Sequence, residues 1–240
     1  MIFCAAALQA APMGTADKIS DTLTVRNDFW QCSFIEGSIF PSDFVFKNGT
    51  RPGVILFRDI ASVGKNYYTL HDERHAERRI ISNTADECII ETSGTFWRNQ
   101  NPVISALQGV TVSCRYEFKR NSSIVKMQMK YINDSKENIR FHGAFDMTWY
   151  FKNPFDDVSI GGRKIDLKRA MKPVNPFYGK KNAVFANDEC KVVYQAENIC
   201  IIYAGRGHFP LSVSSRTDGM AKTTETVEVL LQLEAVSSAL

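Results

Sequence analysis

The fold of this chain is decided by residues 110–152, which read VTVSCRYEFKRNSSIVKMQMKYINDSKENIRFHGAFDMTWYFK. Apolar and polar side chains alternate through this stretch almost without a break, with short turns at 121–123 and 133–135. Successive side chains of a β-strand point to opposite faces of a sheet, so this period of two predicts three strands with one buried and one wetter face. We assign to the buried face Val110, Val112, Cys114, Tyr116, Phe118, Met127, Met129, Tyr131, Ile139, Phe141, Phe145, Met147, Trp149 and Phe151.

Short strand patterns separated by turn residues continue on both sides of this stretch, whereas helical patterns are scarce. Such a series predicts an all-β chain built as a large antiparallel β-sandwich. A chain of 240 residues that is 44% hydrophobic can bury a full core, and no Pro- or Ser-rich linker divides it. We therefore expect a single β-sandwich domain over residues 21–240.

The N-terminus carries the apolar run IFCAAAL at residues 2–8, followed by Gln-Ala-Ala-Pro. This arrangement is typical of the hydrophobic region and cleavage site of a secretory signal, although a basic residue before the run is missing. We expect residues 1–20 to be a signal-peptide remnant and disordered leader, which implies a periplasmic or extracellular location. The alternative is an ordinary apolar N-terminus. No run reaches the roughly 18 apolar residues of a membrane-spanning helix, so we expect no membrane span.

Charge and motifs exclude several classes of function. The chain has 29 basic and 26 acidic residues and a formal net charge of +3, which is too balanced to predict nucleic acid as a partner. It contains no P-loop, dinucleotide fingerprint or G-x-S-x-G elbow, so we expect no cofactor and no hydrolase of that type.

The six cysteines show no C-x-x-C pair and no spacing typical of a metal site, so we expect no metal. An oxidising compartment would permit disulfides, with Cys88–Cys114 and Cys190–Cys200 as the conceivable pairs. The alternative is that these are buried free thiols.

A row of polar side chains lies on the wetter face of the third predicted strand. His142, Asp146 and Tyr150 are spaced four apart and would share that face, which we expect to be the concave face of the sheet. Imidazole, carboxylate and an aromatic ring are the groups that bind sugar hydroxyls and sugar rings. The alternative is an ordinary solvated strand face.

The segment from Gly64 to Arg79 interrupts the alternation with the charged sequence His-Asp-Glu-Arg-His at 71–75. It does not match the H-E-x-x-H pattern of zinc enzymes. We expect His71, Arg74 and His75 to belong to a loop that closes over the sugar, with Arg74 or Arg115 holding any acidic group.

The segments Val112–Phe118, Ile124–Asn133 and Ile139–His142 resemble the middle of the galactose-mutarotase-like supersandwich proteins, and residues 218–233 resemble that family's closing turn and final strand. The resemblance implies the supersandwich fold. In true mutarotases a histidine placed like His142 is the general acid and a glutamate late in the chain is the general base. That glutamate has no counterpart between His208 and Met220.

Together these patterns predict a secreted carbohydrate-binding domain whose ligand is a sugar or an acidic glycan. One alternative is a carbohydrate-active enzyme, either an aldose epimerase, a polysaccharide lyase or a glycoside hydrolase, with His142 as the catalytic acid or base. Another is a non-catalytic structural or partner-binding surface domain, because a fold does not determine a function.

Overall fold

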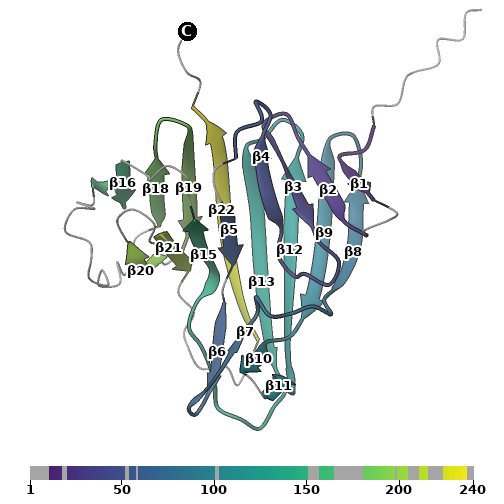
Figure 1. Cartoon of the computed structure of the whole chain (residues 1–240), viewed down its shortest axis with the longest axis vertical. Helices are drawn as coiled ribbons and strands as arrows, with labels where there is room; N and C mark the ends of the chain where they lie inside the picture. The colour runs from purple at the N-terminus through teal and green to yellow at the C-terminus, as the bar shows by residue number, and fades with distance from the viewer. Residues whose placement is uncertain are drawn as a thin grey trace, which may run out of the picture.

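The computed structural model of the chain describes residues 11–17, 21–51, 54–57, 59–100, 103–150, 157–164, 181–197, 199–204, 211–215 and 224–236. All regular structure within these ranges is β, and every strand pair within them is antiparallel. The sheets stack as layers (Figure 1), so the prediction of an all-β antiparallel sandwich is confirmed. The same ranges contain no helix long and apolar enough to cross a membrane.

A nine-stranded sheet forms one layer, in the order β17-β16-β18-β19-β22-β13-β12-β9-β8. The first two predicted strands, β12 and β13, pair along their whole length, from Val110 opposite Asn133 to Phe118 opposite Val125. The strands of this sheet are β8 (Glu77–Asn83), β9 (Glu87–Gly94), β12 (Val110–Lys119), β13 (Ile124–Asn133), β16 (Asp157–Ile160), β17 (Arg163–Lys164), β18 (Asn182–Ala186), β19 (Cys190–Ala196) and β22 (Glu225–Ala235).

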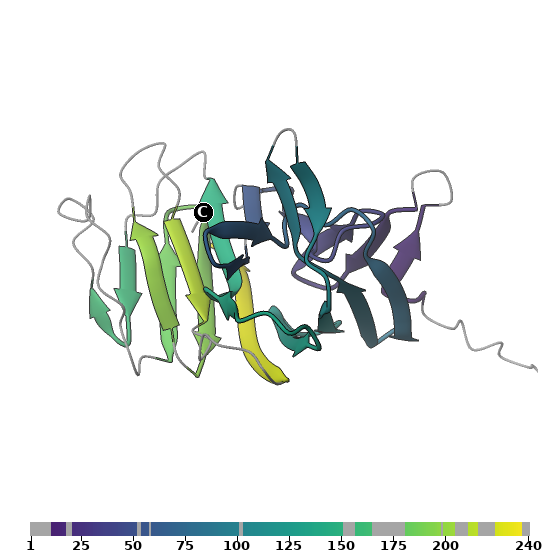
Figure 2. The ribbon, with the colours of Figure 1, turned by 90° about the horizontal axis from the view of Figure 1, so that it is seen from below.

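Two four-stranded sheets cover the inner face of the nine-stranded sheet. The first is β1 (Gly14–Ala16), β2 (Leu23–Arg26), β3 (Trp30–Phe34) and β4 (Ser42–Phe46), and the second is β5 (Val54–Phe57), β15 (Ala144–Tyr150), β21 (Leu211–Ser215) and β20 (Ile199–Ala204). Figure 2 shows the purple sheet β1–β4 at one end of the sandwich and the green strands β18 and β19 at the other. Within the expected disordered leader, residues Gly14–Ala16 instead form β1, which pairs with β2, and Met13 is buried. Residues 1–10 and 18–20 lie outside the described ranges.

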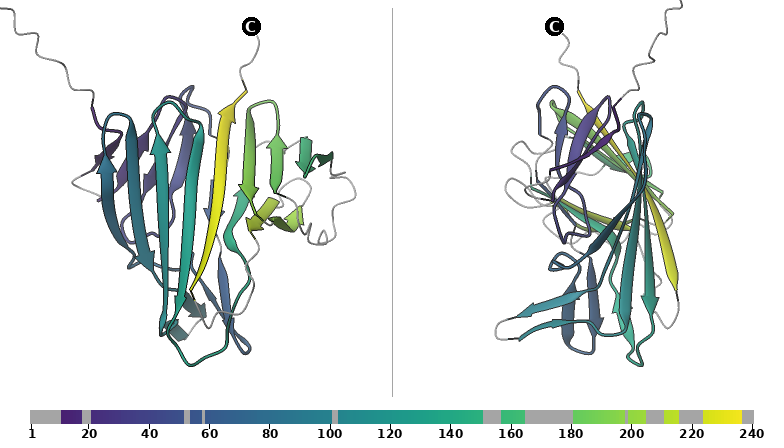
Figure 3. Two further views of the ribbon diagram at one scale, coloured as in Figure 1. Left: turned by 180° about the vertical axis from the view of Figure 1, so that it is seen from behind. Right: turned by 90° about the vertical axis from the view of Figure 1, so that its right-hand side faces the viewer.

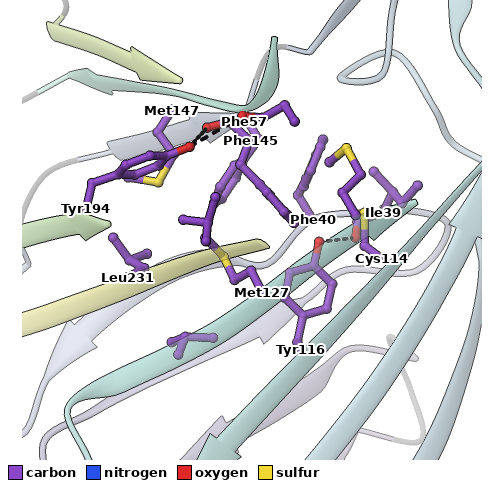
Figure 4. Packing of buried hydrophobic residues seen from close by; sticks show 14 of the residues in the cluster. Ile39, Phe40, Phe57, Cys114, Tyr116, Met127, Phe145, Met147, Tyr194 and Leu231 are labelled. Carbon is purple, nitrogen blue, oxygen red and sulfur yellow. Dashed lines mark hydrogen bonds between the residues drawn. The ribbon is translucent and has the colours of Figure 1, made fainter. Parts of the chain in front are cut away.

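Aromatic side chains fill the space between the layers. The Trp30 ring packs edge-on against Phe118, and Phe57 stacks on Phe40. The buried tyrosine hydroxyls donate to backbone carbonyls, Tyr116 to Ile39 and Tyr194 to Phe145 (Figure 4). Burying these large rings stabilises the sandwich, and the hydrogen bonds remove the cost of burying the hydroxyls. Every residue assigned above to the buried face is buried, except Trp149 and Phe151, whose side chains lie outside the described part.

The third predicted strand is two strands in two different sheets, so its continuity was predicted wrongly. Its first part, β14 (Ile139–Phe141), belongs to a five-stranded sheet, and its second part is β15 of the second four-stranded sheet. Phe145 adopts a φ of 49° and the register shifts between Ala144 and Met147, so the chain turns from one sheet into the other. The remaining strands of the five-stranded sheet are β6 (Ile60–Val63), β7 (Asn66–Thr69), β10 (Trp97–Gln100) and β11 (Val103–Ala106). In the edge-on view of Figure 3 they project at the lower end of the sandwich.

Four cysteines in the described part are free and buried: Cys32, Cys88, Cys114 and Cys190. The conceivable Cys88–Cys114 bridge is not formed, because Cys88 lies opposite Phe118 and Cys114 lies opposite Thr92. The partners are four residues apart along the strands, which is too far for a disulfide.

Candidate functional site

The five-stranded sheet has one face in the core and one face in solvent. Ala61 and Phe141 are paired neighbours on the inner face, and Phe141 stacks on Tyr131 of the nine-stranded sheet at a centroid distance of 4.2 Å. Ser62 lies opposite Arg140 on β14 and opposite Tyr67 on β7. Residues directly opposite one another in a sheet project on the same side, so these three form a row on the outer face.

His142 completes this group from just beyond β14. Its backbone N–H donates to the Ile60 carbonyl at 3.0 Å, which extends the ladder by one residue. Its Nε2 lies 2.9 Å from the Ser62 hydroxyl oxygen, and its ring centroid lies 5.9 Å from that of Tyr67. His142 is exposed, and Tyr67 is 53% exposed. We call Ser62, Tyr67, Arg140 and His142 the His142 face.

The electrostatics of this face favour an uncharged imidazole beside a guanidinium that pairs with none of the described residues. Partial burial, and then the positive charge of Arg140, lower the pKa of His142. The hydrogen bond with Ser62 occupies Nε2 and leaves Nδ1 for a ligand. Arg140 is exposed and has no ion pair or hydrogen bond within the described ranges.

The loop at residues 71–75 is fastened to the protein through a buried carboxylate. Glu73 Oε1 accepts the backbone N–H groups of Arg74 at 2.8 Å and His75 at 2.6 Å, and Oε2 accepts that of Thr95 at 2.7 Å. The Arg74 guanidinium donates to the carbonyls of His71 and Glu73. The Arg74 guanidinium therefore stabilises the loop, and it has fewer N–H groups left to donate to a ligand than we expected.

The loop does reach the same side of the small sheet as His142, at the sheet's other end. The His75 ring lies 5.3 Å from that of Trp97, which lies opposite Thr69 on β7. His142 lies beside Ile60 of β6, Ile60 lies opposite Thr69 of β7, and Trp97 is on the next strand, β10. Three strand spacings, or about 14 Å, therefore separate the backbones of His142 and Trp97. The Trp97 indole N–H is buried and finds no acceptor among the described residues.

Arg115 does not join this face. Arg115 lies on the outer face of the nine-stranded sheet, where it pairs with Glu91 at 2.8 Å and Glu117 at 3.0 Å. The small sheet packs on the inner face of that sheet, so the two outer faces point apart. Asp146 and Tyr150 lie in β15, in a different sheet from β14, and their side chains lie outside the described part.

Sequence reasoning missed Ser62, Tyr67, Arg140 and Trp97. Arg140 lies between Ile139 and Phe141, which the alternation assigned to the buried face, but nothing in the sequence showed that β6 and β7 would bring Ser62 and Tyr67 beside it. Within the described ranges no group of three or more His, Cys, Asp or Glu side chains could hold a metal ion.

No protein-family model and no curated protein sequence matches this chain. Its fold matches solved structures of glycosidases. The match to an alpha-mannosidase from Enterococcus faecalis V583 has a TM-score of 0.67 at 10% identity, and it covers 95% of this chain and 30% of that one. A glycosyl hydrolase family 38 protein from Enterococcus faecalis gives a TM-score of 0.65 at 10% identity, with 95% of this chain and 32% of that one covered.

The alpha-galactosidase from Lactobacillus brevis gives a TM-score of 0.52 at 10% identity, with 92% of this chain and 40% of that one covered. Identities this low show a shared fold and nothing finer. The chain spans about a third of the length of these proteins. It thus has the fold of a β-sandwich part of carbohydrate-active enzymes.

Proposed function

We propose that this chain is a carbohydrate-binding domain of the galactose-mutarotase-like supersandwich type, and that the sugar binds on the His142 face. The observation that carries the proposal is the grouping, on one face of a sheet, of an exposed tyrosine, a neutral histidine fixed by a serine, and an arginine with no partner among the described residues. The likeness to glycosidase structures supports it, because they share the fold.

The side chains of this face match what a sugar presents. The Tyr67 ring offers an apolar surface on which the C–H face of a sugar ring can stack. His142 Nδ1 offers a sugar hydroxyl a donor or an acceptor, according to the tautomer of the imidazole, while the buried Ser62 hydroxyl bonds to Nε2. Because Ser62 and the backbone bond to Ile60 hold the imidazole in place, little conformational freedom is lost when a sugar binds.

Binding is favoured over catalysis by the surroundings of His142. Acid–base chemistry on a sugar needs a second titratable group near the first. No carboxylate contacts His142 within the described part of the chain. We propose that the domain is exported, on the ground of the apolar run at residues 2–8. We also propose that it works beside a catalytic unit, since the glycosidases that share its fold are about three times as long.

The test is calorimetry of the whole chain against a glycan panel, comparing wild type with Tyr67→Ala and His142→Ala. Loss of binding in both variants is expected. The matched control is Lys130→Ala, which removes an exposed side chain from the nine-stranded sheet. Thermal unfolding of all variants checks that they fold.

Retention of glycan binding by both variants would show that the site is elsewhere, and failure of the wild type to bind any glycan would refute the proposed function. Sugar turnover followed by NMR, lost in His142→Ala, would instead identify an enzyme.

A further inference from the structure

We infer that the His142 face selects uronates, with the Arg140 guanidinium binding the sugar carboxylate. The inference rests on the proposed function and adds the chemical class of the ligand. It starts from a comparison of three arginines. The forks of Arg74 and Arg115 are occupied by backbone carbonyls and by two glutamates, respectively, whereas Arg140 is exposed and unpaired within the described ranges.

Arg140 lies where a substituent of a stacked sugar would reach it. It is the direct neighbour of Ser62, which is the direct neighbour of Tyr67, so two strand spacings, or about 10 Å, separate the backbones of Arg140 and Tyr67. A sugar ring on Tyr67 fills part of that gap, and the long arginine side chain spans the rest. Arginine presents a planar fork of N–H donors that matches a carboxylate in a bidentate pair.

The charge of the face is suited to an anion. Arg140 is the one charged side chain among the four residues of the His142 face, because the lowered pKa of His142 keeps the imidazole neutral at neutral pH. No carboxylate of the described residues pairs with Arg140 and competes with a ligand. A bound carboxylate would also oppose the effect of Arg140 on His142, so binding should raise the pKa of the imidazole and should tighten as the pH falls.

The experiment compares oligosaccharides that differ only in charge. Trimers of galacturonate, glucuronate and mannuronate are each titrated into the whole chain as the free acid and as the methyl ester. The wild type is expected to bind at least one free acid about tenfold more tightly than its ester, because a charge-assisted hydrogen bond is worth roughly that factor. The preference should weaken as salt is added.

Arg140→Gln is expected to abolish the preference for the free acid over its ester, while Arg140→Lys keeps part of that preference. Arg79→Gln is the matched control, since Arg79 is an exposed arginine on the nine-stranded sheet. A second readout needs no sugar: Arg140→Gln should raise the pKa of His142 in an NMR titration of the imidazole.

Each outcome decides one of the two proposals. Binding of neutral glycans with equal affinity for acid and ester would overturn the uronate inference and leave the proposed function standing. A preference for the acid that survives in Arg140→Gln would assign it to another residue and overturn the inference as well. No binding to any acid, ester or neutral glycan would refute the proposed function itself.

Discussion

The carboxylate of Glu73 should contribute more to stability than its place in a charged loop suggests. Its side chain is buried, and it accepts three backbone N–H groups at 2.6–2.8 Å. Hydrogen bonds to charged groups contribute roughly 1.5–3 kcal/mol each and are not additive, and a buried group left unpaired costs more than the bond it loses. We therefore expect Glu73→Ala to lower the free energy of unfolding by roughly 3–5 kcal/mol.

Glu73→Gln should lower the free energy of unfolding by less than Glu73→Ala does, roughly 1.5–3 kcal/mol. The amide keeps one oxygen for the N–H groups of Arg74 and His75 but turns its NH2 toward the N–H of Thr95. Urea denaturation measures both variants, and amide hydrogen exchange should become faster at Thr95. Glu77→Ala is the control and should not move the urea midpoint, since the Glu77 side chain is 74% exposed. A loss below about 1 kcal/mol in Glu73→Ala, with unchanged exchange at Thr95, would refute the reasoning.

Three further predictions concern backbone, junction and thiols. Gly37→Ala should lower the urea midpoint strongly, because Gly37 has a φ of 69° and an added Cβ would lie 2.0 Å from the Arg74 carbonyl oxygen. Asp59→Ala should cost roughly 1–3 kcal/mol in urea denaturation, because it leaves the buried N–H of Phe145 without its acceptor at 3.0 Å. Burial raises the pKa of Cys88 to about 11, so iodoacetamide at pH 8 should alkylate it about a hundredfold more slowly in native than in unfolded protein, as peptide mapping would show.

Periodicity predicted the strands and their faces well because the in–out alternation is a local property of the backbone. It identified β12 and β13 and nearly all of their buried side chains. It failed at residues 139–151 for a physical reason: a chain that turns from one sheet into another can keep its alternation. Ile139 and Met147 are both buried although their strands pair in different sheets.

The site was harder to predict because its members come from distant parts of the chain. His142 was expected to be accessible, and it is exposed. Its hydrogen-bond partner Ser62 is 80 residues away, however, and the pairing depends on which strand lies beside β14. Arg115 was equally well placed by alternation, yet it lies on the outer face of another sheet. Alternation gives the face of a strand, whereas the grouping of side chains depends on strand order, which a single sequence does not reveal.

The junction that breaks the third predicted strand also positions the site. The chain passes between the same two sheets twice, once between β5 and β6 and once between β14 and β15. Asp59, between β5 and β6, accepts the N–H of Phe145 in β15, so a hydrogen bond joins the two passages. This hydrogen bond places Ile60, the first residue of β6, beside His142, which comes shortly before β15. The His142 N–H therefore donates to the Ile60 carbonyl at 3.0 Å. The buried hydrogen bond thus positions the backbone at His142, and Ser62 fixes the ring at 2.9 Å. We therefore expect the imidazole to hold the same orientation with and without a ligand.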